Sequence, residues 1–291
     1  MIFTIENEKL KVQISDRGAE LQSVQTKDGA EYLWQGDKKY WGDRALNLFP
    51  YIARLTEGKY TLNGQTYEMT IHGFVNYSVL EAEVQESSRV VFRLTESEET
   101  LKMYPFAFVY RVIYELEDNR LKVTFSVENP NGRTMYFGIG GHPGFQVPLE
   151  KGLAFEDYYL QFDGEKNPVR VGFTPACFLD GNDQEYALWE GGRIPLSHDL
   201  FDEDAIVLKD MEKAVTLCSD KGIHGVRVEY PQMDYLGIWH MPFTDAPYVC
   251  IEPWSSLPSR QDVVEDLEKQ PGLIHLPAGE TYENTWTISI F

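Results

Sequence analysis

Residues 106–127 read FAFVYRVIYELEDNRLKVTFSV and contain the clearest strand pattern in the chain. Residues 106–116 are rich in aromatic and β-branched side chains, which fit a pleated and half-buried surface. Asp118 and Asn119 then supply turn chemistry. The positions after the turn alternate strictly between apolar and polar residues up to Val127. A period of two predicts a strand with one buried face, so this stretch predicts two long strands joined by a turn.

The same signals recur along the whole chain. Residues 59–62 and 65–69 flank Asn63-Gly64, a pair that tolerates the positive φ angles of a two-residue hairpin turn. Apolar alternation or short β-branched runs predict further strands at residues 10–14, 90–94, 135–139, 158–162, 205–208, 214–218, 226–230, 236–240, 248–252 and 286–290.

Helix signals are few. Residues 96–103 are expected to form one or two turns before Pro105. A second helix is expected between a capping Ser259 and the Pro271-Gly272 pair, because apolar residues there fall at helical spacing. Strands outnumber helices and do not alternate with them, so we predict an all-β chain of large antiparallel sheets, as a sandwich or a barrel. The sequence has no linker or repeat, and a single domain over residues 1–291 is expected.

Composition excludes several classes of partner. The 291 residues include 26 Lys and Arg against 46 Asp and Glu, a formal net charge of −20, with no basic cluster. A nucleic-acid partner and an anionic membrane surface are therefore not expected. The chain has no run of 18 apolar residues, and its first residues, MIFTIE, lack the features of a signal peptide.

The three cysteines are widely spaced and form no CxxC pair, so neither a disulfide framework nor a zinc knuckle is expected. Cys218 lies in an apolar run and is expected to be a buried small hydrophobe. A reducing cytoplasm fits this pattern best.

Two of the six histidines have unusual neighbours. His72 lies in IHGF (residues 71–74) just after the predicted hairpin, and His142 lies in GGHPGF (residues 140–145) after a predicted strand. Neighbouring glycines allow close approach of backbone or ligand, and loops at strand ends often carry site residues. The structural alternative is a histidine hydrogen-bonded within a turn. For His198, His224, His240 and His275 that alternative is favoured.

Glu252 is the acidic candidate. It closes an apolar strand and precedes Pro253 and Trp254, so partial desolvation could raise its pKa toward the range of a general base. Arg54, beside an apolar stretch, is a candidate cation. Trp41 and Trp254 lie near these candidates in the sequence and offer flat faces that suit sugar rings. A solvated Glu, a surface Arg and core tryptophans are the alternatives.

Several catalytic motifs are absent. The sequence contains no GxGxxG after a strand, no phosphate-binding GxxxxGK[ST], no HExxH and no GxSxG. The histidines do not pair at metal-ligand spacing with a carboxylate or cysteine. We therefore expect no metal and no nucleotide cofactor.

Several segments together resemble the aldose 1-epimerase (galactose mutarotase-like) family, and most resemble its branch typified by the bacterial lactose-operon X protein. They occur in the family's order and span nearly the whole chain. They are YW at 40–41, LFP at 48–50 with Arg54, the NG turn at 63–64, HGF at 72–74, GHPGF at 141–145, IEPW at 251–254, EK at 268–269 and PAGE at 277–280.

The resemblance implies a β-supersandwich with an open sugar-binding cleft and interconversion of aldose anomers without a cofactor. By motif match, His142 corresponds to the family's acid, His72 to its second histidine and Glu252 to its base. Arg54 corresponds to the arginine that holds sugar hydroxyls. The family's hydroxyl-binding aspartate falls within residues 201–205, where Asp204 is favoured and Asp202 is the alternative.

These residue types suit the implied chemistry. Opening a cyclic hemiacetal removes the proton on O1 and delivers one to the ring oxygen, which a carboxylate and an imidazolium can do. The partner is then a small aldose, with the oligomeric state left open.

Two alternatives remain open at this point. One is a hexose-6-phosphate mutarotase, with Arg44 and Arg54 as phosphate donors. Asn76 stands where related sequences often have arginine, which weakens that alternative. The other is a sugar-binding protein without activity, because fold alone does not determine function.

Overall fold

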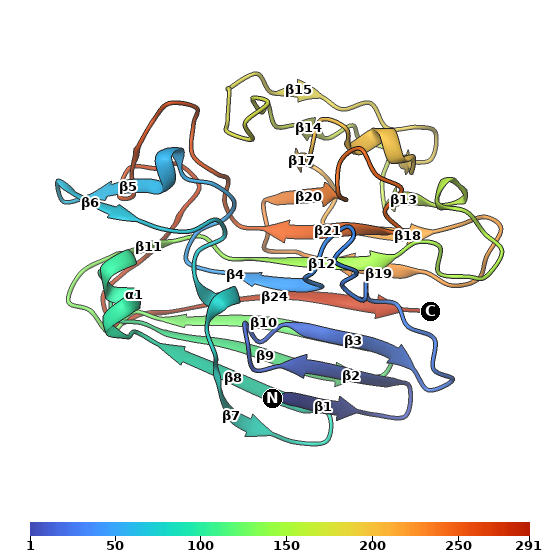
Figure 1. Ribbon diagram of the computed structural model, residues 1–291, viewed down its shortest axis with the longest axis horizontal. Helices are drawn as coiled ribbons and strands as arrows, with labels where there is room; N and C mark the ends of the chain where they lie inside the picture. Colours follow the sequence, from blue (N-terminus) through green and yellow to red (C-terminus); the bar gives the residue numbers. More distant parts are fainter.

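The computed structural model describes residues 1–291 and confirms an all-β fold built on large antiparallel sheets. Two large sheets dominate the molecule (Figure 1). A core of 63 buried residues draws side chains from both of them and from both ends of the chain, Ile5 to Ile290. The sheets approach closely, because a Cβ at Gly141 of one would lie 2.6 Å from Cζ2 of Trp286 on the other.

The first large sheet has nine strands. In spatial order they are β16 (Arg193–Pro195), β13 (Tyr159–Phe162), β18 (Ala214–Cys218), β19 (Val226–Glu229), β24 (Thr281–Ile290), β10 (Arg120–Glu128), β9 (Val109–Glu117), β8 (Arg89–Thr95) and β7 (Glu81–Gln85).

The second large sheet has seven strands and carries the site described below. In spatial order they are β15 (Gln184–Glu185), β14 (Val169–Arg170), β17 (Ile206–Lys209), β20 (Tyr235–Trp239), β21 (Tyr248–Trp254), β12 (Gly140–Gln146) and β4 (Ala45–Leu48).

Smaller sheets and short helices complete the chain. The small sheets are β1 (Ile2–Glu6), β2 (Leu10–Ser15) and β3 (Leu21–Thr26), then β22 (Glu265–Asp266), β5 (Lys59–Leu62) and β6 (Gln65–Glu68), and the pair β11 (Met135–Phe137) and β23 (Ile274–Leu276). The helices are η1 (Thr56–Gly58), η2 (Val75–Tyr77), α1 (Glu98–Met103), η3 (Phe155–Asp157) and η4 (His198–Phe201). None of them is long and apolar enough to span a bilayer.

The pattern at residues 106–127 forms the hairpin β9–β10 at the centre of the nine-stranded sheet. Leu116 pairs with Leu121 across the turn, and burial alternates along β9 as the sequence predicts. Strand β9 begins at Val109 rather than at residue 106. The Asn63-Gly64 turn between β5 and β6 is also confirmed, with φ angles of 51° and 75°.

The prediction of a helix after Ser259 is wrong. Asp262 has a φ of 58°, which interrupts helical geometry, and Glu265–Asp266 instead pairs in parallel with β5. The Glu265 carboxylate binds both Nε and Nη2 of Arg260 at 2.9 Å. The hydroxyl of Ser259 accepts the backbone N–H of Thr56 rather than capping a helix. These contacts, rather than the helical spacing of the apolar residues, determine the conformation of the segment.

The expectation for Cys218 is also wrong in part. Its side chain lies at the end of β18, beside Tyr159, and is half-buried rather than buried. Cys250, in β21, is the cysteine that the core encloses.

Candidate active site

One row of residues crosses five neighbouring strands of the seven-stranded sheet. It runs through Leu46, His142, Glu252, Gly237 and Val207, on β4, β12, β21, β20 and β17. Residues directly opposite each other in antiparallel strands point to the same face. That face is turned away from the main core. The row therefore forms the floor of a site, and the lack of a side chain at Gly237 allows Glu252 and Trp254 to pack closely against it.

His142 and Glu252 are in contact. Nε2 of His142 lies 3.2 Å from Oε2 of Glu252, and their side chains are only 10% and 2% exposed. Burial, and then the charge of Asp204, raises the pKa of the Glu252 carboxyl well above its usual 4.5. Burial, and then the neighbouring His72, lowers the pKa of His142 well below 6.5. Burial therefore favours the uncharged form of each group.

Backbone geometry positions His72 at the wall of the same pocket. Its φ is 63°, and Gly73 follows with a φ of 76°. A Cβ at Gly73 would lie 2.1 Å from the carbonyl oxygen of Phe49, so only glycine fits there. Nδ1 of His72 accepts the backbone N–H of Ala53, which leaves Nε2 as the protonated nitrogen.

The charge state of His72 follows from its surroundings. Burial, reinforced by the Arg54 charge, lowers its pKa to about 4. At neutral pH it is therefore an uncharged donor that offers one N–H.

Arg54 and Asp204 lie on the pocket wall. The Arg54 side chain is exposed and makes no hydrogen bond or ion pair within the protein, so its guanidinium is available to a ligand. Asp204 has a φ of 72°, and its Oδ2 accepts the Cys177 thiol at 2.7 Å. Asp202 does not line this pocket. Its carboxylate accepts the N–H of Phe243 on the outer surface, so of the two aspartates only Asp204 reaches the site.

Three tryptophans surround the His142–Glu252 pair. The ring of Trp41 lies over the His142 imidazole with centroids 4.8 Å apart, and Trp239 meets both rings edge-on at 5.7 Å. Trp254 is buried, and its Nε1 has no protein partner. Gly140 and Gly237 flank it, and a Cβ on either would come within about 3 Å of the indole. Flat faces and free polar tips are what sugar pockets use.

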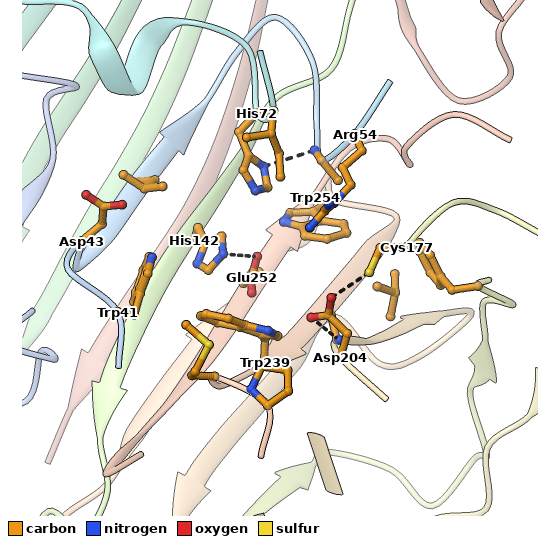
Figure 2. A pocket seen from close by; sticks show the side chains of 18 of the residues that line it. Trp41, Asp43, Arg54, His72, His142, Cys177, Asp204, Trp239, Glu252 and Trp254 are labelled. Atoms are coloured by element: carbon orange, nitrogen blue, oxygen red, sulfur yellow. Dashed lines mark hydrogen bonds and ion pairs between the residues drawn. The ribbon is translucent and has the colours of Figure 1, made fainter. Parts of the chain in front are cut away.

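The pocket has a volume of about 440 Å³, within the usual range for small-ligand sites. Figure 2 shows His72, Arg54, Trp254, Glu252, Trp239 and Asp204 around one hollow. The only Lys or Arg lining it is Arg54, against the carboxyl groups of Asp43, Glu203, Asp204 and Glu252. Arg44 lies outside it, and its guanidinium bonds to Gln22.

All seven residues singled out from the sequence, His142, Glu252, His72, Arg54, Asp204, Trp41 and Trp254, line this pocket, and none of the other four histidines does. The residue that sequence reasoning missed is Cys177, which binds Asp204 from a loop without any recognisable motif. In the sequence, Asn76 is distinguished only because it stands where related sequences often have arginine. It is buried at the pocket wall, with an unpartnered Oδ1.

The fold also assembles a group that the sequence spacing did not predict. Ligand atoms of His142, Cys250 and Glu252 lie within 4.8 Å of one another, a set that could hold a metal ion. Burial raises the pKa of the Cys250 thiol well above its usual value, and a protonated thiol is a poor ligand. The prediction of a site without metal remains a prediction.

Known structures define the class of fold. The galactose mutarotase related enzyme from Lactobacillus acidophilus shares 38% identity with a TM-score of 0.94, covering 100% of this chain and 97% of that one. A galactose mutarotase-like protein from Lactobacillus casei shares 34% identity with a TM-score of 0.94, covering all of both chains. The protein therefore has a galactose mutarotase-like fold.

Sequence comparison defines the family. The sequence model for aldose 1-epimerase matches residues 1–289. The plasmid and chromosomal LacX proteins of Lactococcus lactis subsp. lactis are each 32% identical over 298 residues, covering 100% of this chain and 99% of theirs. The chain belongs to the aldose 1-epimerase family, as its motifs indicated.

Proposed function

We propose that the protein is an aldose 1-epimerase that interconverts the α and β anomers of a free hexose. The observation that carries this proposal is the contact between a buried carboxyl group and a buried imidazole, Glu252 and His142, at the floor of a pocket of about 440 Å³. Membership of the family supports the reaction class.

In the proposed mechanism, Glu252 removes the proton from O1 while His142 delivers one to the ring oxygen. The C1–ring-oxygen bond breaks and the C1–O1 bond becomes a carbonyl. After rotation about C1–C2 the carbonyl presents its other face. His142 then takes the proton back from the hydroxyl formed at the ring oxygen, and Glu252 returns one to O1. Each positioned proton transfer is typically worth about 10²–10⁴ in rate.

Burial suits this cycle, because the pair carries one titrating proton throughout and has no net charge in either state. The pair that burial favours at rest is carboxylic acid with neutral imidazole, which is also the state reached after ring opening. Transfer of its proton from Glu252 to His142 gives the carboxylate and imidazolium from which opening starts. An uncompensated charge at a site this enclosed would be costly, whereas moving one proton within a neutral pair is not. The 3.2 Å contact keeps the two states coupled.

The remaining groups hold the sugar. His72 donates one N–H, Arg54 offers unpaired donors, and Asp204 accepts hydroxyl protons. Trp41 and Trp239 enclose the reacting pair and exclude water. These residues lower the entropic cost of reaction by orientation.

The charges favour a neutral sugar over a sugar phosphate. A phosphate usually needs a fork of arginines, and the pocket offers only Arg54 among four carboxyl groups. The uncharged Asn76 stands where an arginine would strengthen phosphate binding.

The proposal is tested by saturation-transfer NMR of α-D-glucose, α-D-galactose and glucose 6-phosphate, with buffer catalysis subtracted. We expect acceleration of a free hexose, loss of that acceleration in Glu252→Gln, and a lower kcat/KM for the phosphate. Tight sugar binding without a rate above buffer would instead indicate a binding protein.

A further inference from the structure

Arg54 and Asp204 carry opposite charges and line the same pocket, yet no ion pair joins them (Figure 2). An arginine and a carboxylate that share a pocket readily form a bidentate pair. Such a pair would occupy the polar atoms that both residues would otherwise offer to a sugar. The contacts that hold Asp204 apart from Arg54 therefore decide whether its carboxylate is available to a ligand.

Two hydrogen bonds hold the Asp204 carboxylate. Its Oδ1 accepts the backbone N–H of Ala205 at 3.0 Å, and its Oδ2 accepts the Cys177 thiol at 2.7 Å (Figure 2). A carboxylate oxygen has two lone-pair sites, so each oxygen keeps one for a sugar hydroxyl. Because the bond from Ala205 is local to the turn, Cys177 provides the only side-chain restraint on the orientation of this carboxylate.

The backbone is constrained at both ends of the contact between Cys177 and Asp204. Cys177 has a φ of 65° and Asp204 a φ of 72°. This left-handed conformation costs free energy at a residue other than glycine and persists only where the surroundings fix it. The N–H of Cys177 donates to the carbonyl oxygen of Thr174 at 2.9 Å, which closes the tight turn that carries the thiol. The fold therefore presents the thiol and the carboxylate to each other from two fixed turns.

Backbone hydrogen bonds tie the turn of Cys177 to the segment that carries Arg54. The N–H of Leu179 donates to the carbonyl oxygen of Ser259, and the N–H of Ser259 donates to that of Arg54, each at 3.0 Å. The turn is thus fastened to the same backbone that places the guanidinium in the pocket. The thiol then reaches Asp204, so this chain of bonds sets the position of the carboxylate relative to Arg54.

The thiol is a hydrogen-bond donor rather than a nucleophile. The Cys177 side chain is half-buried. Burial, followed by the hydrogen bond to Asp204 and the charge of that carboxylate, raises the pKa of the thiol to about 11, and the charge of Arg54 opposes this rise only in part. At neutral pH the sulfur therefore keeps its proton, and it is the thiolate that reacts with electrophiles and oxidants. A serine hydroxyl would donate a proton from the same position.

We infer that Cys177 is a positioning residue for sugar binding, whose thiol holds the Asp204 carboxylate unpaired and oriented to accept sugar hydroxyls. This inference rests on the proposed epimerase function and adds to it a residue that acts through Asp204. Without the thiol, the carboxylate is free to rotate toward Arg54, and both groups are then less available to the sugar. The proton transfers of His142 and Glu252 are left intact, so the effect falls on KM rather than on kcat.

The test compares glucose and galactose mutarotation by wild type, Cys177→Ala, Cys177→Ser and Cys218→Ala, measured by saturation-transfer NMR over a range of sugar concentrations. Cys218→Ala is a matched control, because Cys218 is also half-buried but lies on β18 and does not line the pocket. We expect Cys177→Ala to raise KM about tenfold and to change kcat less than about twofold, because a hydrogen bond to a charged group is lost. Cys177→Ser should keep KM within about threefold of wild type, since its hydroxyl donates to the same oxygen. Cys218→Ala should change neither value.

A double-mutant cycle with Asp204→Ala shows whether Cys177 acts through that carboxylate. If it does, adding Cys177→Ala to Asp204→Ala should lower kcat/KM by less than about a further twofold. Losses that multiply, a Cys177→Ala or Asp204→Ala enzyme with the wild-type KM, or a KM raised equally by alanine and serine at position 177 would refute the positioning role and leave the epimerase standing. If wild type accelerates neither sugar, the proposed function fails and this inference fails with it.

Discussion

Replacing Glu252 by glutamine is expected to stabilise the folded protein relative to wild type, by an amount that grows as the pH rises. The Glu252 side chain is 2% exposed, and burial raises its pKa well above 4.5. The folded state therefore keeps this proton at pH values where the unfolded chain has lost it. Where the folded state binds more protons, stability falls with rising pH.

The magnitude follows from this proton difference. Above pH 4.5, wild type loses about 1.4 kcal/mol of unfolding free energy relative to Glu252→Gln for each pH unit. The loss continues until the pH reaches the pKa of the folded carboxyl. Glutamine has no such proton, and the two proteins share every other titrating group, so their difference isolates the Glu252 carboxyl.

The assay is urea unfolding followed by tryptophan fluorescence at pH 5.5, 6.5 and 7.5. Glu265→Gln is a matched control, because Glu265 is a glutamate that is similarly buried, with an exposure of 3%. Burial tends to raise the Glu265 pKa, but the Arg260 fork outweighs it and the pKa is lowered. The ionised Glu265 carboxylate therefore makes its full contribution to the unfolding free energy at every pH above 4.5. The unfolding free energies of Glu265→Gln and wild type should then differ by a constant amount across the three pH values. A Glu252→Gln difference that is equally flat would refute the reasoning.

Three further predictions follow from the pocket walls. Gly73→Ala should lower the unfolding free energy in urea by about 3 kcal/mol, because its Cβ would overlap the Phe49 carbonyl at a positive φ. Gly237→Ala should raise KM for hexose about tenfold, since its Cβ would lie 3.1 Å from the Trp254 indole and 3.2 Å from Cβ of Glu252 and would displace these pocket residues. His72→Asn should lower kcat/KM about tenfold without shifting the pH–rate profile between pH 5 and 8, because His72, with a pKa of about 4, is uncharged there.

Much of the fold is predictable because its signals are local. The β9–β10 hairpin follows from alternation and a turn within 22 residues, and the Asn63-Gly64 turn follows from two residues alone. Such patterns determine which face of a strand is buried before any distant contact forms.

The segment after Ser259 was not predictable in this way. Its apolar residues fall at helical spacing, yet pairing with β5 and the Arg260–Glu265 ion pair determine its conformation. The strand partner lies about 200 residues earlier in the chain. Local propensity is a weak prior against such contacts.

The site residues likewise fall into those with a local sequence signal and those whose role depends on distant contacts. Glycines marked His72 and His142 as unusual, and the family motifs indicated Glu252, Arg54 and Asp204. The contact between His142 and Glu252, however, depends on the register of β12 against β21, which no periodicity reports. Cys177 could not be found from sequence, because its role requires a loop fold that brings its thiol to Asp204.

The measurement that tests the central claim most directly is a double-mutant cycle of hexose mutarotation with His142→Asn, Glu252→Gln and the double variant. If the two residues share one proton and act as one unit, each single variant should lose about 10²–10⁴ in kcat. The double variant should then lose scarcely more than the worse single one. Losses that multiply, or a single variant with the wild-type rate, would contradict the account.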